Sequence, residues 1–307
     1  MARKLRFLPV SPSPTLVFVT CRTIQGRYLF RPGPQFNDVF LGILGREQRR
    51  YQVRICAVCA LSSHFHLLLI IEDARQLSRF MRDLKSKLAR EVNRLTGWRG
   101  PVFDRRYEMV VVTDEESAQV ERLLYIFSNG CKEGLVERPQ DWPGVHCVKA
   151  LQGALLTGHW FDRTREFAAR NQRQPFDRLR YATEETVVLS PIPCWAHLSP
   201  ELYRTRVAAL VDSVVAEAAL ARSQTGRPVE GVESILSRNP QYRPAELVCS
   251  PAPLVHAATK RARKAFYKMY SWFVAAFRTA ADMLKQGARD APFPVGSFPP
   301  GLPFVAG

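Results

Sequence analysis

The chain has 307 residues, of which 46% are hydrophobic and 23% charged, so it is long enough to bury a substantial core. Its 44 Lys and Arg residues against 28 Asp and Glu give a formal charge of +16, which indicates a polyanionic partner, or else a charge that serves only solubility. No apolar run reaches the length of a membrane span and the start "MARKLRF" does not resemble a signal peptide, so we expect a cytoplasmic protein outside the membrane.

The seven cysteines are odd in number and scattered from Cys21 to Cys249, which is typical of reduced thiols. Cys56 and Cys59 form a C-x-x-C, but residues three apart in a strand point to opposite faces. No second such motif is present, so we expect neither zinc nor redox use.

The first 150 residues alternate between strand and helix patterns. Short β-branched or apolar runs predict strands, and apolar residues at helical spacing predict helices. The predicted order is a strand at 15–24, a helix at 35–51, strands at 53–61 and 64–71, a helix at 74–95 and a strand at 102–112. A capping box of Thr113 and Glu116 then predicts the start of another helix. This order predicts an α+β fold, a ferredoxin-like split βαβ sheet with one added helix.

Beyond this first domain, 1–150, the pattern changes. Turn signals predict a connector at 151–199, and a C-terminal helical extension follows at 200–290. We expect its long helices at 200–222 and about 256–285, with a short helix and turn within 229–246. The run "KRARK" (260–264) gives the last helix a basic edge suited to DNA, and the tail 291–307 is expected to be irregular.

His64 and His66 interrupt the apolar run "CALSSHFHLLLIIED". Residues two apart in a strand share a face, so the two imidazoles are predicted to lie side by side while Phe65 and Leu67 point the other way. Such a pair can bind a divalent metal, but an isolated His-x-His is also compatible with histidines in a sheet that have no catalytic or binding role.

The helix after the fourth predicted strand adds two polar side chains. Its predicted core stripe faces the sheet and consists of Val120, Leu123, Leu124, Phe127 and Cys131. Tyr125 and Asn129 fall opposite that stripe and are neighbours because they are four residues apart.

These motifs together resemble a known family. "HFHLLL" is similar to the His-hydrophobe-His motif of the HUH endonucleases, and "YIFSNGCKEGLV" resembles the tyrosine helix of the single-tyrosine transposases of the insertion-sequence 200 type. The REP-associated tyrosine transposase branch is the most similar, and "VFDRRYEMVVVTDEE" resembles its segment before that helix. The resemblance covers 15 to about 150 and carries no function for the remainder.

The resemblance implies a metal-dependent endonuclease and strand transferase that acts on single-stranded DNA with a hairpin, as a single chain or a homodimer. His64, His66 and Asn129 would hold Mg²⁺ or Mn²⁺, and Tyr125 would attack phosphorus to form a 5′-phosphotyrosine and free a 3′-hydroxyl. The cations that we place along the DNA backbone, each of which is equally compatible with solvated surface charge, are Arg22, Arg27, Lys85, Arg105, Arg106, Lys132, Lys260, Arg261 and Arg263.

The chain departs from the family pattern at two places. Ser62-Ser63 stands where Pro-Asn or Pro-Glu is usual before the first histidine. Asn129-Gly130-Cys131 replaces Asn-Pro-Val after the tyrosine helix, and the lost proline can move the helix end. Neither change removes a catalytic atom, but an inactivated or domesticated copy stays an alternative.

Two other functions compete with this interpretation. A non-catalytic nucleic-acid-binding protein is one, because the RNA-recognition motif has the same sheet architecture; it predicts exposed aromatic side chains on the central strands. A hydrolytic metalloenzyme is the other, but the sequence has no H-E-x-x-H motif or acidic cluster near the histidines.

Overall fold

The computed structural model of the protein describes residues 5–9, 14–170, 177–245 and 252–301. Cys249, Glu246 at the end of the expected short helix and turn, and residues 302–307 of the expected tail lie outside this description. No helix within the described ranges has the length and apolar character needed to cross a membrane.

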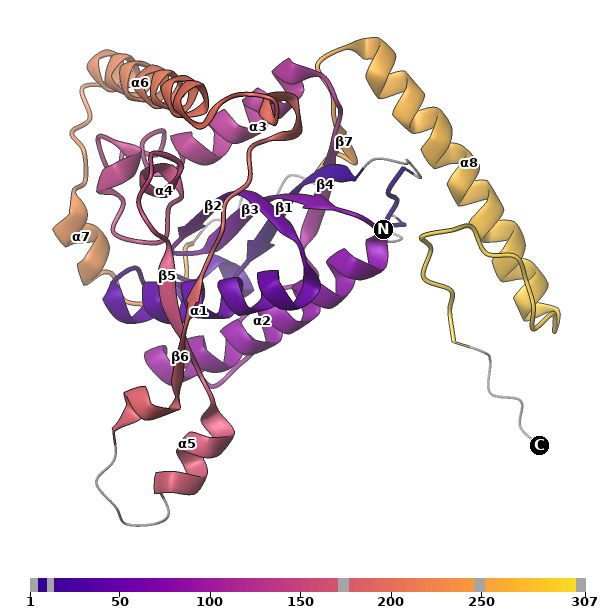
Figure 1. Cartoon of the computed structure of the whole chain (residues 1–307), viewed down its shortest axis with the longest axis horizontal. Coiled ribbons are helices and arrows are strands. Elements are labelled where there is room, and N and C mark those ends of the chain that lie inside the picture. The colour runs from indigo at the N-terminus through magenta and orange to yellow at the C-terminus, as the bar shows by residue number, and fades with distance from the viewer. Residues whose placement is uncertain (1–4, 10–13, 171–176, 246–251, 302–307) are drawn as a thin grey trace.

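The predicted α+β fold is confirmed: a mixed sheet of five strands has helices on both faces (Figure 1). Its strands lie in the order β2-β3-β1-β4-β7. Their bounds are β1 Thr15–Arg22, β2 Arg54–Leu61, β3 His64–Ile71, β4 Glu108–Val112 and β7 Val255–His256. The first four strands pair antiparallel in the ferredoxin-like order, whereas β7 joins β4 in parallel.

One face of the sheet is covered by α1 (Pro34–Tyr51) and α2 (Ala74–Thr96). Aromatic rings fill the space beneath α1: Phe40 lies 5.6 Å from Phe65 of β3, centroid to centroid. Asp73 starts α2, because its carboxylate accepts hydrogen bonds from the backbone N–H groups of Arg75 and Gln76. This face therefore holds the main hydrophobic core, on the side to which Phe65 points.

The opposite face is covered by α3 (Glu116–Ser128), and α6 (Pro200–Thr225) lies over α3 (Figure 1). The expected capping box is wrong, since Glu115 is the N-cap residue and makes no side-chain cap. Thr113 instead hydrogen-bonds Glu115 and the carbonyl of His256, while Glu116 accepts from the Trp195 indole. The Thr113 hydroxyl is thus used by the contact with β7, and the Glu116 carboxylate by the Trp195 indole.

The segment expected as a connector, 151–199, contains regular structure. β5 (Thr157–Phe161) and β6 (Ala182–Thr186) form an antiparallel ribbon that crosses α1, with α5 (Arg163–Arg170) at its far end (Figure 1). The ribbon approaches α1 so closely that a Cβ at Gly42 would lie 2.1 Å from the His159 carbonyl carbon. Glycine at this position is therefore required by the packing.

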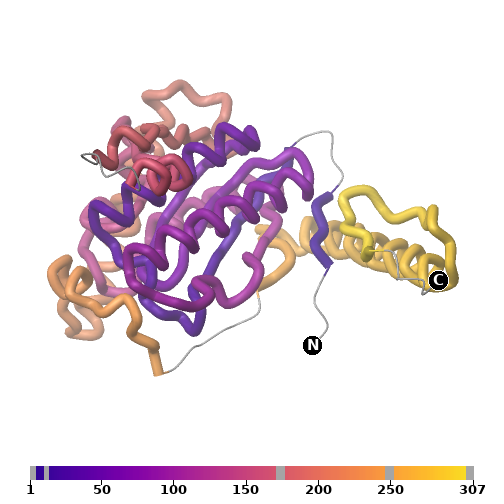
Figure 2. The backbone as a smooth tube through the Cα atoms, turned by 90° about the horizontal axis from the view of Figure 1, so that it is seen from below, coloured from indigo at the N-terminus to yellow at the C-terminus, as the bar shows by residue number. Residues whose placement is uncertain are grey.

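The C-terminal helices have the expected order, and α7 (Val232–Ser237) lies between α6 and α8 (Lys260–Lys285). The expected long helix begins at Lys260 because residues 255 and 256 form β7. Figure 2 shows α8 projecting from the body with the end of the described chain folded back along it. Phe7 tethers α8 to the body, with ring centroids 5.5 Å from Phe266 and 5.0 Å from Phe273. The division of the chain at residue 150 stays a prediction.

Short elements complete the described chain. The remaining α-helix is α4 at Val148–Leu151, and the 3-10 helices are η1 at Ile24–Gly26, η2 at Pro139–Asp141, η3 at Arg178–Tyr181 and η4 at Pro193–Trp195. The predicted strand at 102–112 is shorter than expected, because 102–107 is irregular. Within this segment Phe103 forms an isolated bridge with Thr23.

Candidate active site

His64 and His66 lie side by side at the start of β3, with ring centroids 4.8 Å apart and planes at 80°. They face α3, because the ring of His66 also lies 5.1 Å from Phe18 and 5.5 Å from Tyr125. His64 is half-buried and His66 is only 2% exposed. The alternation of the strand therefore places the pair on the face opposite Phe65.

Hydroxyl groups fix the orientation of both rings. Oγ1 of Thr20 lies 2.9 Å from Nδ1 of His66, and Oγ of Ser63 lies 3.0 Å from Nδ1 of His64. The antiparallel register of β1 and β3 places Thr20 directly opposite His66. With its Nδ1 engaged, His66 has Nε2 left for a ligand, and that atom is buried without a hydrogen-bond partner. Ser63, a departure from the family pattern, thus supplies a partner for the first histidine.

The surroundings of both imidazoles favour the neutral form. Burial, followed by the nearby Arg22 and Lys132 cations, lowers the pKa of His64 to about 3. Burial also brings the pKa of His66 well below its usual range, with His64 and the same two cations acting in the same direction. Neutral imidazole is the form that donates a lone pair to a metal ion.

Tyr125 lies in the same cluster. Its half-buried ring is 5.5 Å from both Phe18 and His66, Nζ of Lys132 lies 3.6 Å from the ring centroid, and the Arg122 guanidinium carbon lies at 5.2 Å. The expectation that Tyr125 points away from the sheet is wrong. Because α3 is covered by the sheet on one side and by α6 on another, its buried arc is wider than one stripe and Tyr125 lies at the edge nearest the histidines.

Asn129 follows the last turn of α3 and is 1% exposed. Its Nδ2 donates to the carbonyl oxygens of Tyr125 at 2.7 Å and Ile126 at 3.2 Å. The amide therefore caps the end of the helix through its nitrogen. Its Oδ1 is buried and has no hydrogen-bond partner, so this oxygen is available to a ligand.

Gly130 explains the departure from the family pattern after the tyrosine helix. Its φ of +89° is in the left-handed region, and its N–H donates to Oε2 of Glu133 at 2.6 Å. Proline can satisfy neither condition, because its φ is fixed near −65° and it has no N–H. The turn after α3 therefore has a glycine conformation that excludes the usual proline.

The predicted DNA-contacting cations fall into separate groups. Arg22 and Lys132 are exposed beside the histidines. Lys85 is half-buried on α2, beyond the opposite face of the sheet, and its Nζ donates to the carbonyl of Arg105 at 2.7 Å. Arg27 lies 4.8 Å over the Trp98 ring and donates to the carbonyl of Gln241. Lys85 and Arg27 thus join segments that are distant in the sequence and stabilise the fold.

Arg105 and Arg106 are exposed before β4, and Arg105 pairs with Asp104 at 2.9 Å. Lys260, Arg261 and Arg263 are exposed at the start of α8. Burial and then the Arg122 guanidinium lower the pKa of His256, and Arg263 acts in the same direction. The N–H groups of Ala258 and Thr259 donate to the Glu115 carboxylate, so the start of α8 lies beside the start of α3.

Several residues of the cluster escaped the sequence prediction: Phe18, Thr20, Ser63 and Arg122. The alternation of β1 predicts that Phe18, Thr20 and Arg22 share a face. Which of them lies opposite His66 depends on the register of β1 with β3, which the sequence does not show. Arg122 lies three residues before Tyr125, a helical spacing that the sequence displays directly.

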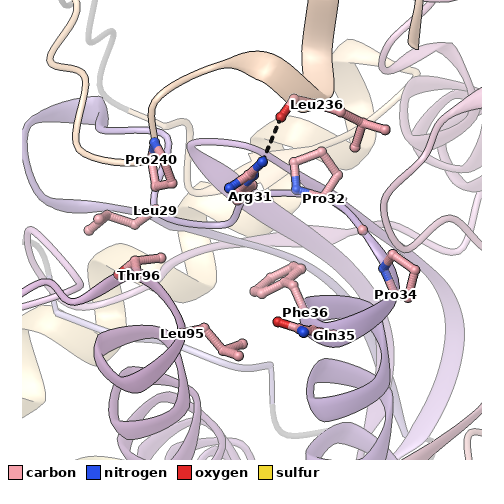
Figure 3. Close-up of a pocket in the computed structure, with 11 residues that line it drawn as sticks. Leu29, Arg31, Pro32, Pro34, Gln35, Phe36, Leu95, Thr96, Leu236 and Pro240 are labelled. Atoms are coloured by element: carbon pink, nitrogen blue, oxygen red, sulfur yellow. Dashed lines mark hydrogen bonds between the residues drawn. The ribbon is translucent and has the colours of Figure 1, made fainter. Parts of the chain in front are cut away.

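Two other features lie apart from this cluster. A hollow of about 480 Å³ between the start of α1 and the end of α2 is lined by Leu29, Phe36, Leu95 and, from the segment after α6, Leu236 (Figure 3). Arg31 reaches across it to the Leu236 carbonyl at 3.0 Å. Cys56 and Cys59 are buried, and a register shift at Cys56 interrupts the pairing of β2 with β3.

Comparison with known proteins finds one matching family model, over about a third of the chain. The family described as IS200-like transposases matches residues 27–128, which include both histidines and Tyr125 and confirm the resemblance. A solved REP-associated tyrosine transposase bound to a REP hairpin is 16% identical, covers 49% of this chain and 84% of its own, and has a TM-score of 0.40. A protein from Deinococcus radiodurans assigned as a transposase is 16% identical, with coverages of 39% and 96% and a TM-score of 0.29. No curated protein matches the chain.

Proposed function

Because residues 27–128 match the IS200-like transposase family, we propose that the protein cuts and rejoins single-stranded DNA at hairpin-bearing sites, with Tyr125 as nucleophile. The observation that carries the proposal is the contact of the Tyr125 ring with His66, whose neighbour His64 lies 4.8 Å away. A nucleophile and two neutral imidazoles thus converge at one end of the sheet. The hairpin target comes from the sequence resemblance.

The family implies a divalent metal, and the residues present fit one. Nε2 of His66 and Oδ1 of Asn129 are buried without hydrogen-bond partners, and a set of nitrogen and oxygen donors suits Mn²⁺ or Mg²⁺. We assign His64, His66 and Asn129 as the residues that would hold it. When bound, the ion supplies Lewis-acid polarisation of a phosphodiester oxygen.

The remaining chemistry belongs to side chains of the chain. The Tyr125 oxygen forms a bond to phosphorus as the bond from phosphorus to the 3′-oxygen breaks; the phenol loses its proton and the departing 3′-oxygen gains one. The cations of Lys132 and Arg122 beside the ring stabilise negative charge on the attacked phosphate. Attack by a second 3′-hydroxyl reverses these bond changes and releases the tyrosine.

Both competing functions fit the structure less well. The RNA-recognition alternative needs exposed aromatic side chains on the central strands, but Phe18 of β1 is 6% exposed and α3 covers that face. The hydrolytic metalloenzyme needs a third strong ligand. Across the described ranges, no three His, Cys, Asp or Glu side chains are grouped to hold a metal ion.

The direction of cleavage tests the proposal. A hairpin oligonucleotide from the DNA flanking the gene, incubated with Mn²⁺, is labelled at its 3′ end in one sample and its 5′ end in another. A 5′-phosphotyrosine keeps the 3′ label on the protein and releases the 5′ label with a free 3′-hydroxyl. Retention of the 5′ label, or two free fragments without any protein adduct, contradicts the proposal.

A further inference from the structure

A second hollow, of about 360 Å³, adjoins the turn that follows α3. One wall is the turn 131–134, and the others come from the last turns of α6 and the loop after it. Its lining includes Lys132, Ala218, Ala221, Arg222, Arg227 and Pro228. Pockets of this size accept small ligands or single building blocks of a polymer.

This hollow shares a wall with the candidate active site. Lys132 lines the hollow, and its Nζ lies 3.6 Å from the centroid of the Tyr125 ring. Backbone hydrogen bonds hold the two walls together: the N–H of Glu230 donates to the Gly134 carbonyl at 2.9 Å, and the N–H of Gly231 donates to the Leu135 carbonyl at 3.1 Å. The position of the hollow relative to Tyr125 is therefore fixed by the fold.

The charges around the hollow favour an anion. Its acidic residues are already engaged, since Glu133 accepts from the N–H of Gly130, and Glu230 accepts from the Arg238 guanidinium. Within the described residues, neither Arg222 nor Arg227 has an acidic partner, and Nη1 of Arg222 is buried without a hydrogen-bond partner. Two guanidinium groups thus lie beside the hollow with free donors.

We propose that this hollow holds one nucleotide of the DNA strand next to the phosphodiester that Tyr125 attacks, an inference that rests on the proposed function. Arg222 and Arg227 contact the phosphate, because a guanidinium matches phosphate oxygens with two parallel hydrogen bonds. Ala218, Ala221 and Pro228 provide the apolar surface for the sugar and base. Because Lys132 borders both the hollow and Tyr125, a DNA strand bound in the hollow has a fixed position relative to the Tyr125 hydroxyl. Helix α6 therefore takes part in selecting the bond that is cleaved.

The test measures binding to a nested series of single-stranded oligonucleotides, shortened one nucleotide at a time from either side of the cleaved bond. The full chain with Tyr125→Phe is the parent, so that no covalent adduct forms, and it is compared with Arg222→Met plus Arg227→Met in the same background. For the longest oligonucleotide we expect about tenfold weaker binding in the double variant. Its salt dependence should be flatter by about 0.7 in log–log slope, since the contact with one phosphate of a single strand is lost.

The length series locates the nucleotide. Once shortening from one side removes it, the double variant and the parent should bind equally. Arg227→Met alone, a change at an exposed residue, should show a smaller loss with the same length dependence. Arg204→Gln is the matched control, because Arg204 is an exposed arginine of α6 that pairs with Glu201 at 3.5 Å, and it should bind like the parent.

Two results overturn the inference: no loss at any length, or an equal loss at every length, which indicates that the arginines support the fold. Failure of the proposed function appears separately. If the unaltered protein forms no adduct while the length-dependent loss persists, the hollow binds DNA without cleavage at Tyr125. If the adduct forms and the arginine variants bind like the parent, only the inference about the hollow fails.

Discussion

Thr20 and His66 are joined across two strands: Oγ1 of Thr20 lies 2.9 Å from Nδ1 of His66, and the two residues are direct partners in the antiparallel register. A ring held through Nδ1 presents Nε2 to a metal ion in one orientation. We therefore predict that Thr20→Val lowers the affinity for Mn²⁺ by about 10- to 100-fold, as is typical for loss of a partner of a metal-bound histidine.

The measurement is adduct formation as a function of Mn²⁺ concentration, accompanied by calorimetric titration of the metal without DNA. Thr20→Ser keeps the hydroxyl and should restore most of the affinity. If Thr20→Val binds Mn²⁺ like the unaltered protein, the threonine does not orient the ligand.

The two histidines should differ in what their removal does to stability. His64 is half-buried, so His64→Ala should abolish metal-dependent cleavage while the melting temperature changes little. His66 is 2% exposed and stacked on Phe18, so its removal should carry a structural cost as well. His66→Ala should also lower the free energy of unfolding by about 2 kcal/mol. Urea denaturation distinguishes the two variants, and full cleavage activity in His64→Ala refutes the metal assignment.

Gly130 should tolerate substitution poorly. Gly130→Ala places a side chain at a φ of +89° and 3.2 Å from Cγ2 of Val136, so we expect a loss of unfolding free energy above the ~1 kcal/mol of conformational strain alone. Gly97→Ala is the control, because Gly97 also has a positive φ but its added Cβ meets no atom within 4 Å. Equal losses in urea denaturation for both variants contradict a packing role for Gly130.

Gly130→Pro restores the residue that is usual in the family but removes the N–H that Glu133 accepts. It should be less stable than Gly130→Ala and should shift the end of α3, lowering adduct formation as well. A proline variant that is as stable and active as the unaltered protein contradicts the conformation described for this turn.

We predict that the cations separate into those that contact DNA and those that stabilise the fold. Neutralising Lys260, Arg261 and Arg263 together should weaken binding of a hairpin oligonucleotide and flatten its salt dependence, because fewer counterions are released. Lys85→Met should leave the salt dependence unchanged and lower stability, because Lys85 donates to the Arg105 carbonyl and lies 4.7 Å over the Phe103 ring. Binding isotherms at several salt concentrations test both expectations, and the reverse pattern contradicts the assignment. Full-length variants are required, since removal of the C-terminal half also removes β7 from the sheet.

The sequence was informative where a pattern depends on local periodicity. The order of the first strands and helices, and the shared face of His64 and His66, follow from the spacing of apolar residues along the chain. The resemblance of "HFHLLL" and "YIFSNGCKEGLV" to a family then connected two segments that no local pattern connects.

What the sequence did not reveal depends on contacts between distant segments. The direction of Tyr125 required knowledge that α6 covers α3, because a helix buried on two sides has no single apolar stripe. β7 has only two residues and can be recognised as a strand only from its pairing with β4, where His256 also accepts from the Thr113 hydroxyl. The contacts of Lys85 and Arg27 within the fold could be recognised only after their partners were visible.

The central claim is that Tyr125 is the nucleophile, and Tyr107 is its rival by position. The Tyr107 hydroxyl accepts from Arg6 at 2.7 Å, and burial raises the pKa of this phenol to about 12, so it is held away from reaction. The most direct measurement is mass spectrometry of the peptide that carries the nucleotide after nuclease and protease digestion of the Mn²⁺-dependent adduct. We predict the nucleotide on Tyr125, no adduct in Tyr125→Phe despite unchanged hairpin binding, and a normal adduct in Tyr107→Phe. A nucleotide on Tyr107, or an adduct that survives in Tyr125→Phe, contradicts the account.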